Sequence, residues 1–127
     1  IQENFRRISY DQIEALNQLK DIAFRTVKPI GEGEIDKIGA LLNEAWEFKK
    51  LSNKGVSNPK IDKIYDLALK NGAWGGKVCG AGGGGFMFFM CDPVKKNKLI
   101  EIMDNSGYHH WDFNVDWNGT QARQLPK

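Results

Sequence analysis

Glycine is concentrated in one short part of this 127-residue chain, and that concentration limits the folds open to it. Eight of the 14 glycines lie within residues 72–85, and an apolar run, FMFFMC at residues 86–91, follows at once. Glycine lets the main chain adopt positive φ angles and approach other groups closely. We therefore predict a glycine loop between two strands, the first near residues 77–79. The length and aromatic content of the apolar run favour a central, buried strand.

An amphipathic helix is predicted over residues 9–27, because apolar residues recur there at steps of three and four. The stripe expected to be buried consists of Ile13, Leu16, Leu19, Ala23 and Val27. Pro29 and the following Gly31–Gly33 segment are expected to end this helix.

Two further helices are predicted before the glycines. The first covers residues 34–51, and Gly55 is expected to follow it in the left-handed conformation. Its buried side should contain Ile35, Ile38, Leu42, Ala45 and Trp46. The next helix has a clear start, because Ser57 or Asn58 can cap it and Pro59 suits its first position. Its apolar face should contain Ile61, Ile64, Tyr65 and Ala68, with a stop at Asn71 and Gly72.

The rest of the chain predicts one more helix and one more strand. Asp92 and Pro93 begin the helix, and Ser106 ends it. The alternating sequence WDFNVDW at residues 111–117 predicts a strand that buries Trp111, Phe113 and Trp117. This order of elements predicts a single α+β domain over residues 1–127, with an antiparallel sheet covered by helices.

Composition excludes several kinds of protein. A net charge of +2 gives no reason to expect a nucleic-acid or membrane partner. Two cysteines, Cys79 and Cys91, are too few for a disulfide framework and indicate a reducing, cytoplasmic setting. The adjacent His109 and His110 have no cysteine at zinc-ligand spacing, so no metal site is expected. Because the sequence starts at Ile1 and not at methionine, we expect it to lie within a longer reading frame.

Successive amides in a glycine loop can form a concave site for an anion such as phosphate. The alternative is a tight connection between strands with no ligand. A Walker A loop is excluded, because Phe86 follows the last glycine where Lys and Ser or Thr would be required. A dinucleotide fingerprint matches Gly80, Gly82 and Gly85, but it should lead into a helix and here leads into a predicted strand.

The sequence GAWGGKVCGAGGGGF at residues 72–86 closely resembles the third motif of the galactokinase, homoserine kinase, mevalonate kinase and phosphomevalonate kinase (GHMP) superfamily. That motif reads approximately Gly-x-Lys-x-Thr/Ser-Gly-Ala-Gly-Gly-Gly-Gly. The sequence GVSNPKID at residues 55–62 resembles the segment that opens a helix in the same family. Residues 45–50 and 84–86 look most like the heptose kinases, which phosphorylate D-glycero-D-manno-heptose 7-phosphate at the anomeric hydroxyl.

The resemblance implies the ferredoxin-like C-terminal domain of a two-domain, ATP-dependent kinase. In this family the N-terminal domain carries the ATP phosphate loop and the catalytic acidic residue, and mainly binds ATP and Mg²⁺. We therefore expect no catalytic residue in this chain, and no activity from it alone. The resemblance places the loop and a lysine beside the transferring phosphate and the sugar phosphate, namely Lys77, Gly80, Ala81, Gly82, Gly83 and Gly84.

The sequence leaves open the identity of the substrate and the role of the Cys79 side chain. Fucokinases and other GHMP small-molecule kinases are the nearest alternatives, and a stand-alone ferredoxin-like module that binds a metabolite is another. An acyltransferase using the glycines for coenzyme A is disfavoured by the strand after Gly85. Cys79 replaces the Thr or Ser of the motif, and because a thiol is a weak hydrogen-bonding group we expect it to serve packing only.

Overall fold

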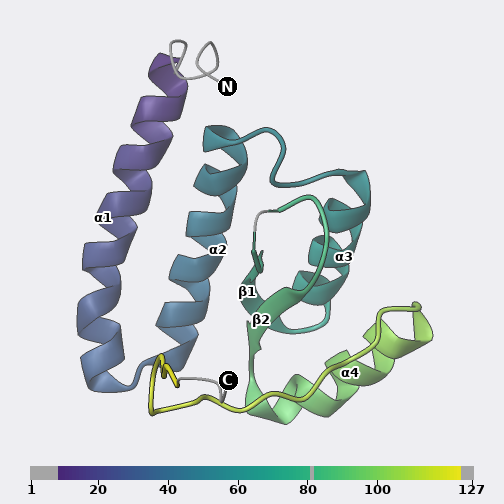
Figure 1. The fold of residues 1–127 in the computed structure, drawn as a ribbon. Helices are drawn as coiled ribbons and strands as arrows, with labels where there is room; N and C mark the ends of the chain where they lie inside the picture. The colour runs from purple at the N-terminus through teal and green to yellow at the C-terminus, as the bar shows by residue number, and fades with distance from the viewer. Residues whose placement is uncertain (1–8, 81, 124–127) are drawn as a thin grey trace.

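The computed structural model describes residues 9–80 and 82–123. The elements are α1 (Tyr10–Glu32), α2 (Ile35–Ser52), α3 (Pro59–Lys70), β1 (Ala73–Val78), β2 (Met87–Cys91), a 3₁₀ turn (Pro93–Lys95) and α4 (Lys96–Asn105). The strands pack against α2 and α3, whereas α1 packs on the outer side of α2 (Figure 1). The predicted α+β class, with an antiparallel sheet covered by helices, is confirmed.

The two strands form an antiparallel pair in which Lys77 is opposite Phe88 and Val78 is opposite Met87. The first strand is longer than the predicted residues 77–79. The second strand is not the central strand that we predicted. Within the described part of the chain it pairs only with β1, and all five of its residues are half-buried.

The core lies where α2, α3 and β1 meet. Its buried side chains are Trp46, Val56, Ile61, Tyr65 and Val78. The Tyr65 ring stacks on Trp46 with 5.7 Å between ring centroids. Its hydroxyl accepts from the Gly76 amide at 3.1 Å and lies 2.9 Å from Asn43 Oδ1. Burial raises the pKa of Tyr65 to about 12, so the hydroxyl keeps its proton at neutral pH.

Close contact between α2 and β1 depends on glycine. A Cβ atom at Gly75 would lie 2.2 Å from the carbonyl oxygen of Gly39 and 2.6 Å from the amide nitrogen of Asn43. Both are backbone atoms, which cannot rotate aside as a side chain can. Gly75 therefore lets the strand that leads into the glycine loop lie directly on α2.

The face of α1 that packs on α2 is not the predicted one. Its buried residues are Ala15, Ile22 and Pro29. In the predicted stripe, Ile13 and Leu16 are each 49% exposed and Val27 is 67% exposed. The helix carries apolar residues on two sides, and contact with α2 decides which side is covered. The stripe that we predicted is therefore wrong.

Pro29 does not end α1 as predicted. The helix continues to Glu32, and Gly33 ends it in the left-handed conformation with φ 70°. The Pro29 ring is buried, and the packing of the ring against the helix pair offsets its missing amide hydrogen bond. The carbonyl oxygen of Pro29 also accepts from the Glu34 amide at 2.9 Å, which closes the helix end.

The boundaries between α2 and α3 are partly as predicted. Gly55 is not in the left-handed conformation; instead the Asn53 side chain accepts from the Gly55 amide at 3.0 Å, which turns the chain. Ile35, predicted to be buried in α2, is 54% exposed. The predicted start of α3 is confirmed, since Asn58 is its N-cap and Pro59 its first residue.

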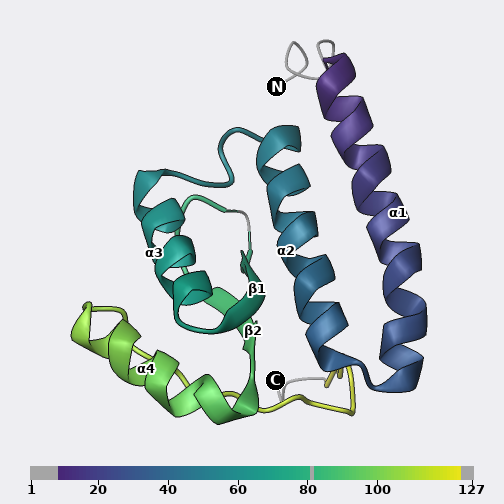
Figure 2. The same cartoon turned by 180° about the vertical axis from the view of Figure 1, so that it is seen from behind.

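Helix α4 closes the lower end of the sheet. A second buried cluster, Ala68, Ala73 and Leu99, joins α3, β1 and α4. Figure 2 shows α4 lying below α3. The predicted start is confirmed, because the Asp92 side chain accepts from the Val94 amide at 2.9 Å and Pro93 opens the turn. None of the helices in the described residues has the length and apolar character needed to cross a membrane.

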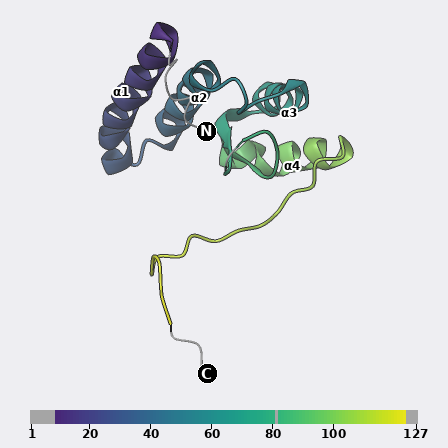
Figure 3. The same cartoon turned by 45° about the horizontal axis from the view of Figure 1, so that its top comes forward.

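The predicted strand at residues 111–117 is wrong. The chain leaves α4 as an extended tail that runs away from the helices (Figure 3). Trp111, Phe113 and Trp117 are 69%, 70% and 90% exposed, so they are not core residues. A strand forms only where a neighbouring strand satisfies its backbone. Trp111 and Phe113 instead meet Phe86 and Phe88 edge to face, at centroid distances of 5.7 and 5.9 Å.

Candidate functional site

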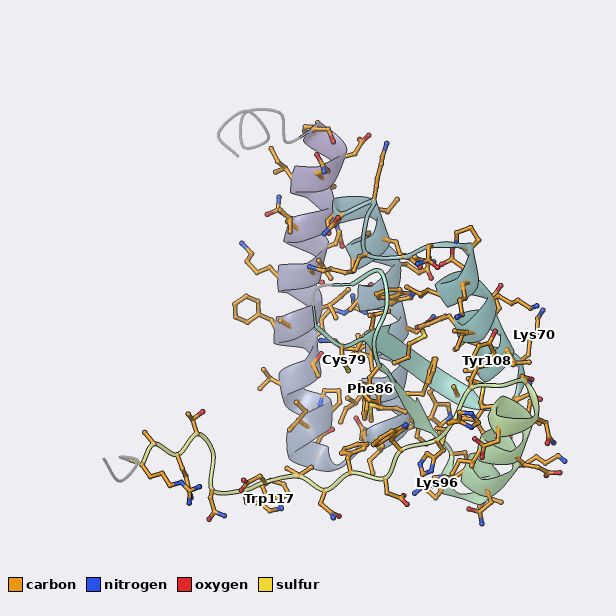
Figure 4. The ribbon with its side chains drawn as sticks, turned by 45° about the vertical axis from the view of Figure 1, so that its right-hand side comes forward. Lys70, Cys79, Phe86, Lys96, Tyr108 and Trp117 are labelled. Atoms are coloured by element: carbon orange, nitrogen blue, oxygen red, sulfur yellow. The ribbon has the colours of Figure 1, made fainter. Side chains whose placement is uncertain are left out.

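Residues 79–86 form the glycine loop between β1 and β2. The Cys79 amide donates to the Phe86 carbonyl at 2.8 Å and closes the loop at its base, where Figure 4 labels both residues. Four glycines have positive φ, namely Gly80 at 84°, Gly82 at 94°, Gly83 at 76° and Gly85 at 92°. Such conformations, which residues with side chains rarely adopt, allow several backbone amides to converge on one anion.

The middle of the loop is held against the start of α3. The Gly83 amide donates to the Val56 carbonyl at 3.1 Å. The Gly83 carbonyl accepts from Asn58 Nδ2 at 3.2 Å. The two segments whose sequences point to one family, residues 55–62 and 72–86, therefore meet in space.

Gly82 also fits tightly against this support. A Cβ atom at Gly82 would lie 2.8 Å from both Cα and Cγ2 of Val56, which is a buried residue. By contrast, among the described residues nothing lies within 4 Å of a Cβ atom placed on Gly80 or Gly84. The loop thus has a docked part, at Gly82 and Gly83, and an open part on either side.

The other predicted site residues are placed as follows. Lys77 is exposed on β1, opposite Phe88. Cys79 is exposed as well, so our expectation that it serves packing is wrong; it follows the last residue of β1, at the start of the glycine loop. Ala81 lies outside the described residues.

Outside the loop, the two histidines among the described residues are each near a single carboxylate. The His109 ring lies 3.8 Å from the Asp104 carboxylate and the His110 ring 3.7 Å from Asp112, both on exposed side chains. Within residues 9–80 and 82–123, no three His, Cys, Asp or Glu side chains gather as a metal site would require.

An open groove of about 610 Å³ lies between α1 and α2. Most of its charged side chains are paired with one another, and Lys28 lies 3.8 Å from Glu32 outside the lining. Arg25 donates two hydrogen bonds to Glu44, each of 2.8 Å, and the pKa of the Glu44 carboxyl is held below its usual value by this guanidinium. Lys37 pairs with Glu34 in the same way. Two of the three cations in the groove, Arg25 and Lys37, are therefore already paired with carboxylates of the same groove.

Sequence reasoning missed how the loop is held. It identified Asn58 as a helix cap, but not its second bond, to a glycine 25 residues further along the chain. Nothing in a single sequence indicates such a contact. The nearest signal was the joint resemblance of the two segments to one family.

Comparison with known proteins gives matches along most of the chain. The profile of the family described as GHMP kinases C terminal matches residues 14–109. The chain is 34% identical to the D-glycero-alpha-D-manno-heptose 7-phosphate kinase of Campylobacter jejuni over 113 residues, or 89% of its length. It is 29% identical to the L-fucokinase/L-fucose-1-P guanylyltransferase of Bacteroides fragilis over 72% of its length, and 31% identical to the galactokinase of Candida parapsilosis, again over 72%.

A solved structure also matches. It is a crystal structure of a Campylobacter jejuni protein assigned as a sugar kinase, with a TM-score of 0.53 and 35% identity over 79% of this chain. The chain covers 30% of that structure. It spans 33% of the heptose 7-phosphate kinase, 10% of the fucokinase protein and 18% of the galactokinase.

Proposed function

Because this chain belongs to the family of GHMP kinase C-terminal domains, we propose that it is the C-terminal half of an ATP-dependent sugar kinase. Its acceptor is D-glycero-D-manno-heptose 7-phosphate, phosphorylated at the anomeric hydroxyl. The match to a heptose 7-phosphate kinase, over 89% of this chain at 34% identity, supports this acceptor. Matches to fucokinases, over 72% and 69% of the chain, make L-fucose the second candidate.

The observation that carries the proposal is the docking of the glycine loop on the start of α3. Phosphoryl transfer requires the acceptor to be held in line and charge to be neutralised on the transferring oxygens. A loop fixed at Gly83 by two hydrogen bonds, with open glycines on either side, suits that task. The amides of Gly80, Gly82 and Gly84 are the donors that we assign to phosphate oxygens.

Two further parts of the proposal concern charge. Lys77 is exposed beside the loop and supplies a cation for the phosphate of ATP or of the sugar. In kinase sites Mg²⁺ is bound by one or two carboxylates together with the substrate phosphates. The glycine loop, residues 79–86, contains no carboxylate, so it does not fit the metal, and we assign the carboxylate ligands to the rest of the enzyme.

We place the remaining functions in the part of the enzyme that lies outside this chain. The N-terminal domain holds ATP and the catalytic acid, and residues 1–127 are one domain that closes the active site from the other side. The isolated fragment is therefore inactive. Both described cysteines are free thiols, which agrees with a cytoplasmic enzyme.

The test uses the full-length protein that contains these residues, with Mg-ATP and three acceptors: the heptose 7-phosphate, L-fucose and D-galactose. Formation of ADP is measured, and kcat/KM is determined for each acceptor. We expect the heptose 7-phosphate to be preferred. A higher value for fucose would replace the proposed substrate. The absence of ATP-dependent phosphorylation of all three would refute the proposed sugar kinase and leave another GHMP small-molecule kinase or a metabolite-binding module.

A variant of the loop tests the site. In Gly83→Val, a β-branched residue occupies a position with φ 76°, which strains the backbone, although the nearest atom to a Cβ is 3.6 Å away. Turnover should fall at least about tenfold, because small displacements of positioning groups are costly. The far-UV circular dichroism should not change. Unchanged turnover would remove the loop from the proposed site.

A further inference from the structure

We propose that Asn58 is a positioning residue for phosphoryl transfer, because it ties the glycine loop to the rigid start of α3. The inference rests on the proposed function for its kinetic part only. The bonds that carry it all meet at one side-chain amide, which connects segments far apart in the sequence.

The Asn58 side chain makes three hydrogen bonds. Its Oδ1 accepts from the amides of Lys60 and Ile61, each at 3.0 Å, and so caps α3. Because two backbone N–H groups point at this oxygen, the other end of the amide must be the nitrogen. That nitrogen donates to the Gly83 carbonyl at 3.2 Å.

Only a side chain with an acceptor and a donor at this spacing can do both tasks. Serine and aspartate cap helices about as well as asparagine. Serine is too short to cap α3 and reach the loop at once, and an ionised aspartate has no hydrogen to donate. Asparagine can therefore cap α3 and hold the loop at once, whereas serine and aspartate can only cap. Replacing Asn58 by serine thus tests the loop bond separately from the cap.

The loop receives its position from this bond and from one other. The Gly83 amide bonds to the Val56 carbonyl at 3.1 Å, so both polar groups of one glycine are held by residues just before α3. Val56 is buried and Ile61 is part of the same core, so the support is rigid. Loss of the Asn58 bond leaves the loop with one polar attachment in place of two.

The experiment compares three variants of the full-length protein. Asn58→Ser keeps the cap and removes the loop bond without adding charge. Asn58→Ala removes both. Ser9→Ala is the matched control, because Ser9 caps α1 by accepting from the Gln12 amide at 3.3 Å, and α1 packs chiefly against α2.

For Asn58→Ser we expect the melting temperature to stay near that of the wild type. With Mg-ATP and the heptose 7-phosphate, kcat should fall about two- to tenfold, as the loss of one net hydrogen bond allows. KM for ATP should change less than twofold, since we assign ATP binding to the other domain. Hydrogen exchange of the Gly83 amide, the loop amide bonded to Val56, should accelerate by a similar factor. Ser9→Ala should lower the melting temperature and leave kcat and loop exchange unchanged.

Two results would overturn the inference. One is loop exchange in Asn58→Ser equal to that of the wild type. The other is a fall in kcat for Ser9→Ala as large as for Asn58→Ser, since capping alone would then explain the loss. If the wild type phosphorylates no sugar, the proposed function fails, and the exchange measurement still decides whether Asn58 positions the loop.

Discussion

Gly82 is the loop residue at which an added methyl group should cost most. In Gly82→Ala, the new Cβ atom would lie 2.8 Å from Cα and from Cγ2 of Val56. Ordinary contacts between carbon atoms are about 3.5–4.0 Å. The Val56 Cα belongs to the backbone of a buried residue and cannot turn aside, so the loop must move away.

The free-energy cost of Gly82→Ala to the docked loop has two contributions. A residue other than glycine at φ 94° carries a backbone strain of about 1–2 kcal/mol. Movement of the loop also lengthens the 3.1 Å bond from the Gly83 amide to Val56, worth about 1 kcal/mol. The docked loop should therefore lose about 2–3 kcal/mol relative to the undocked loop.

The chain offers two graded controls. Gly80 has φ 84° and no described atom within 4 Å of an added Cβ, so Gly80→Ala should cost the strain alone, about 1–2 kcal/mol. Gly84 has equally open surroundings and no positive φ. Gly84→Ala should therefore have little effect on the docked loop, or stabilise it by a few tenths of a kcal/mol through the unfolded chain.

Hydrogen exchange of the Gly83 amide measures this directly, because that amide is the one bonded to Val56. In Gly82→Ala its exchange should accelerate about 30- to 160-fold, up to the rate of an unprotected amide, since each 1.4 kcal/mol is a factor of ten. Gly80→Ala should be intermediate and Gly84→Ala close to the wild type. If Gly82→Ala and Gly84→Ala exchange within threefold of each other, the loop is not docked as described.

Two further predictions concern the core and the thiols. Tyr65→Phe should destabilise the protein by about 1–3 kcal/mol at pH 8, because the buried Gly76 amide loses its acceptor. Burial raises the pKa of Tyr65 from 10.0 to about 12. The protonated hydroxyl therefore makes its full contribution to the free energy of unfolding below pH 10, and this contribution is lost as the pH rises to about 12. In urea unfolding, the difference in free energy of unfolding between wild type and Tyr65→Phe should therefore narrow over that pH range. A constant difference would contradict this prediction. With a thiol reagent, exposed Cys79 should react faster than Cys91, which is half-buried and whose pKa is raised by that burial; equal rates would count against the loop geometry.

Local signals predicted the elements well, and contacts between distant parts of the chain explain the failures. The start of α3 was predictable because a cap and a first-turn proline act on adjacent residues. The strand at residues 111–117 was not, because alternation requires a sheet to pair with, and the described sheet has two strands. The buried face of α1 depends on α2, so Ala15 and Ile22 could not be chosen over Ile13 from the helix alone.

The candidate site shows the same division between local and distant signals. The sequence located the loop, since consecutive glycines with a strand on either side are a local pattern. It did not indicate which glycines hold the loop in place and which face open space. In the structure, the amide and carbonyl of Gly83 are bonded to Val56 and Asn58, whereas Gly82 packs closely against Val56.

That separation changes how the loop can act on a phosphate. The Gly83 amide already donates to the Val56 carbonyl, so it cannot also be a full donor to a ligand while the loop is docked. An anion beside the loop must then be held by its neighbours, with Gly80 and Gly84 facing open space. A substitution at Gly83 therefore acts by displacing the loop, whereas a side chain at Gly84 would enter the space that we assign to the ligand. In the full-length protein, Gly84→Val should raise KM while leaving the Gly83 amide protected, and Gly83→Val should lower kcat and lose that protection.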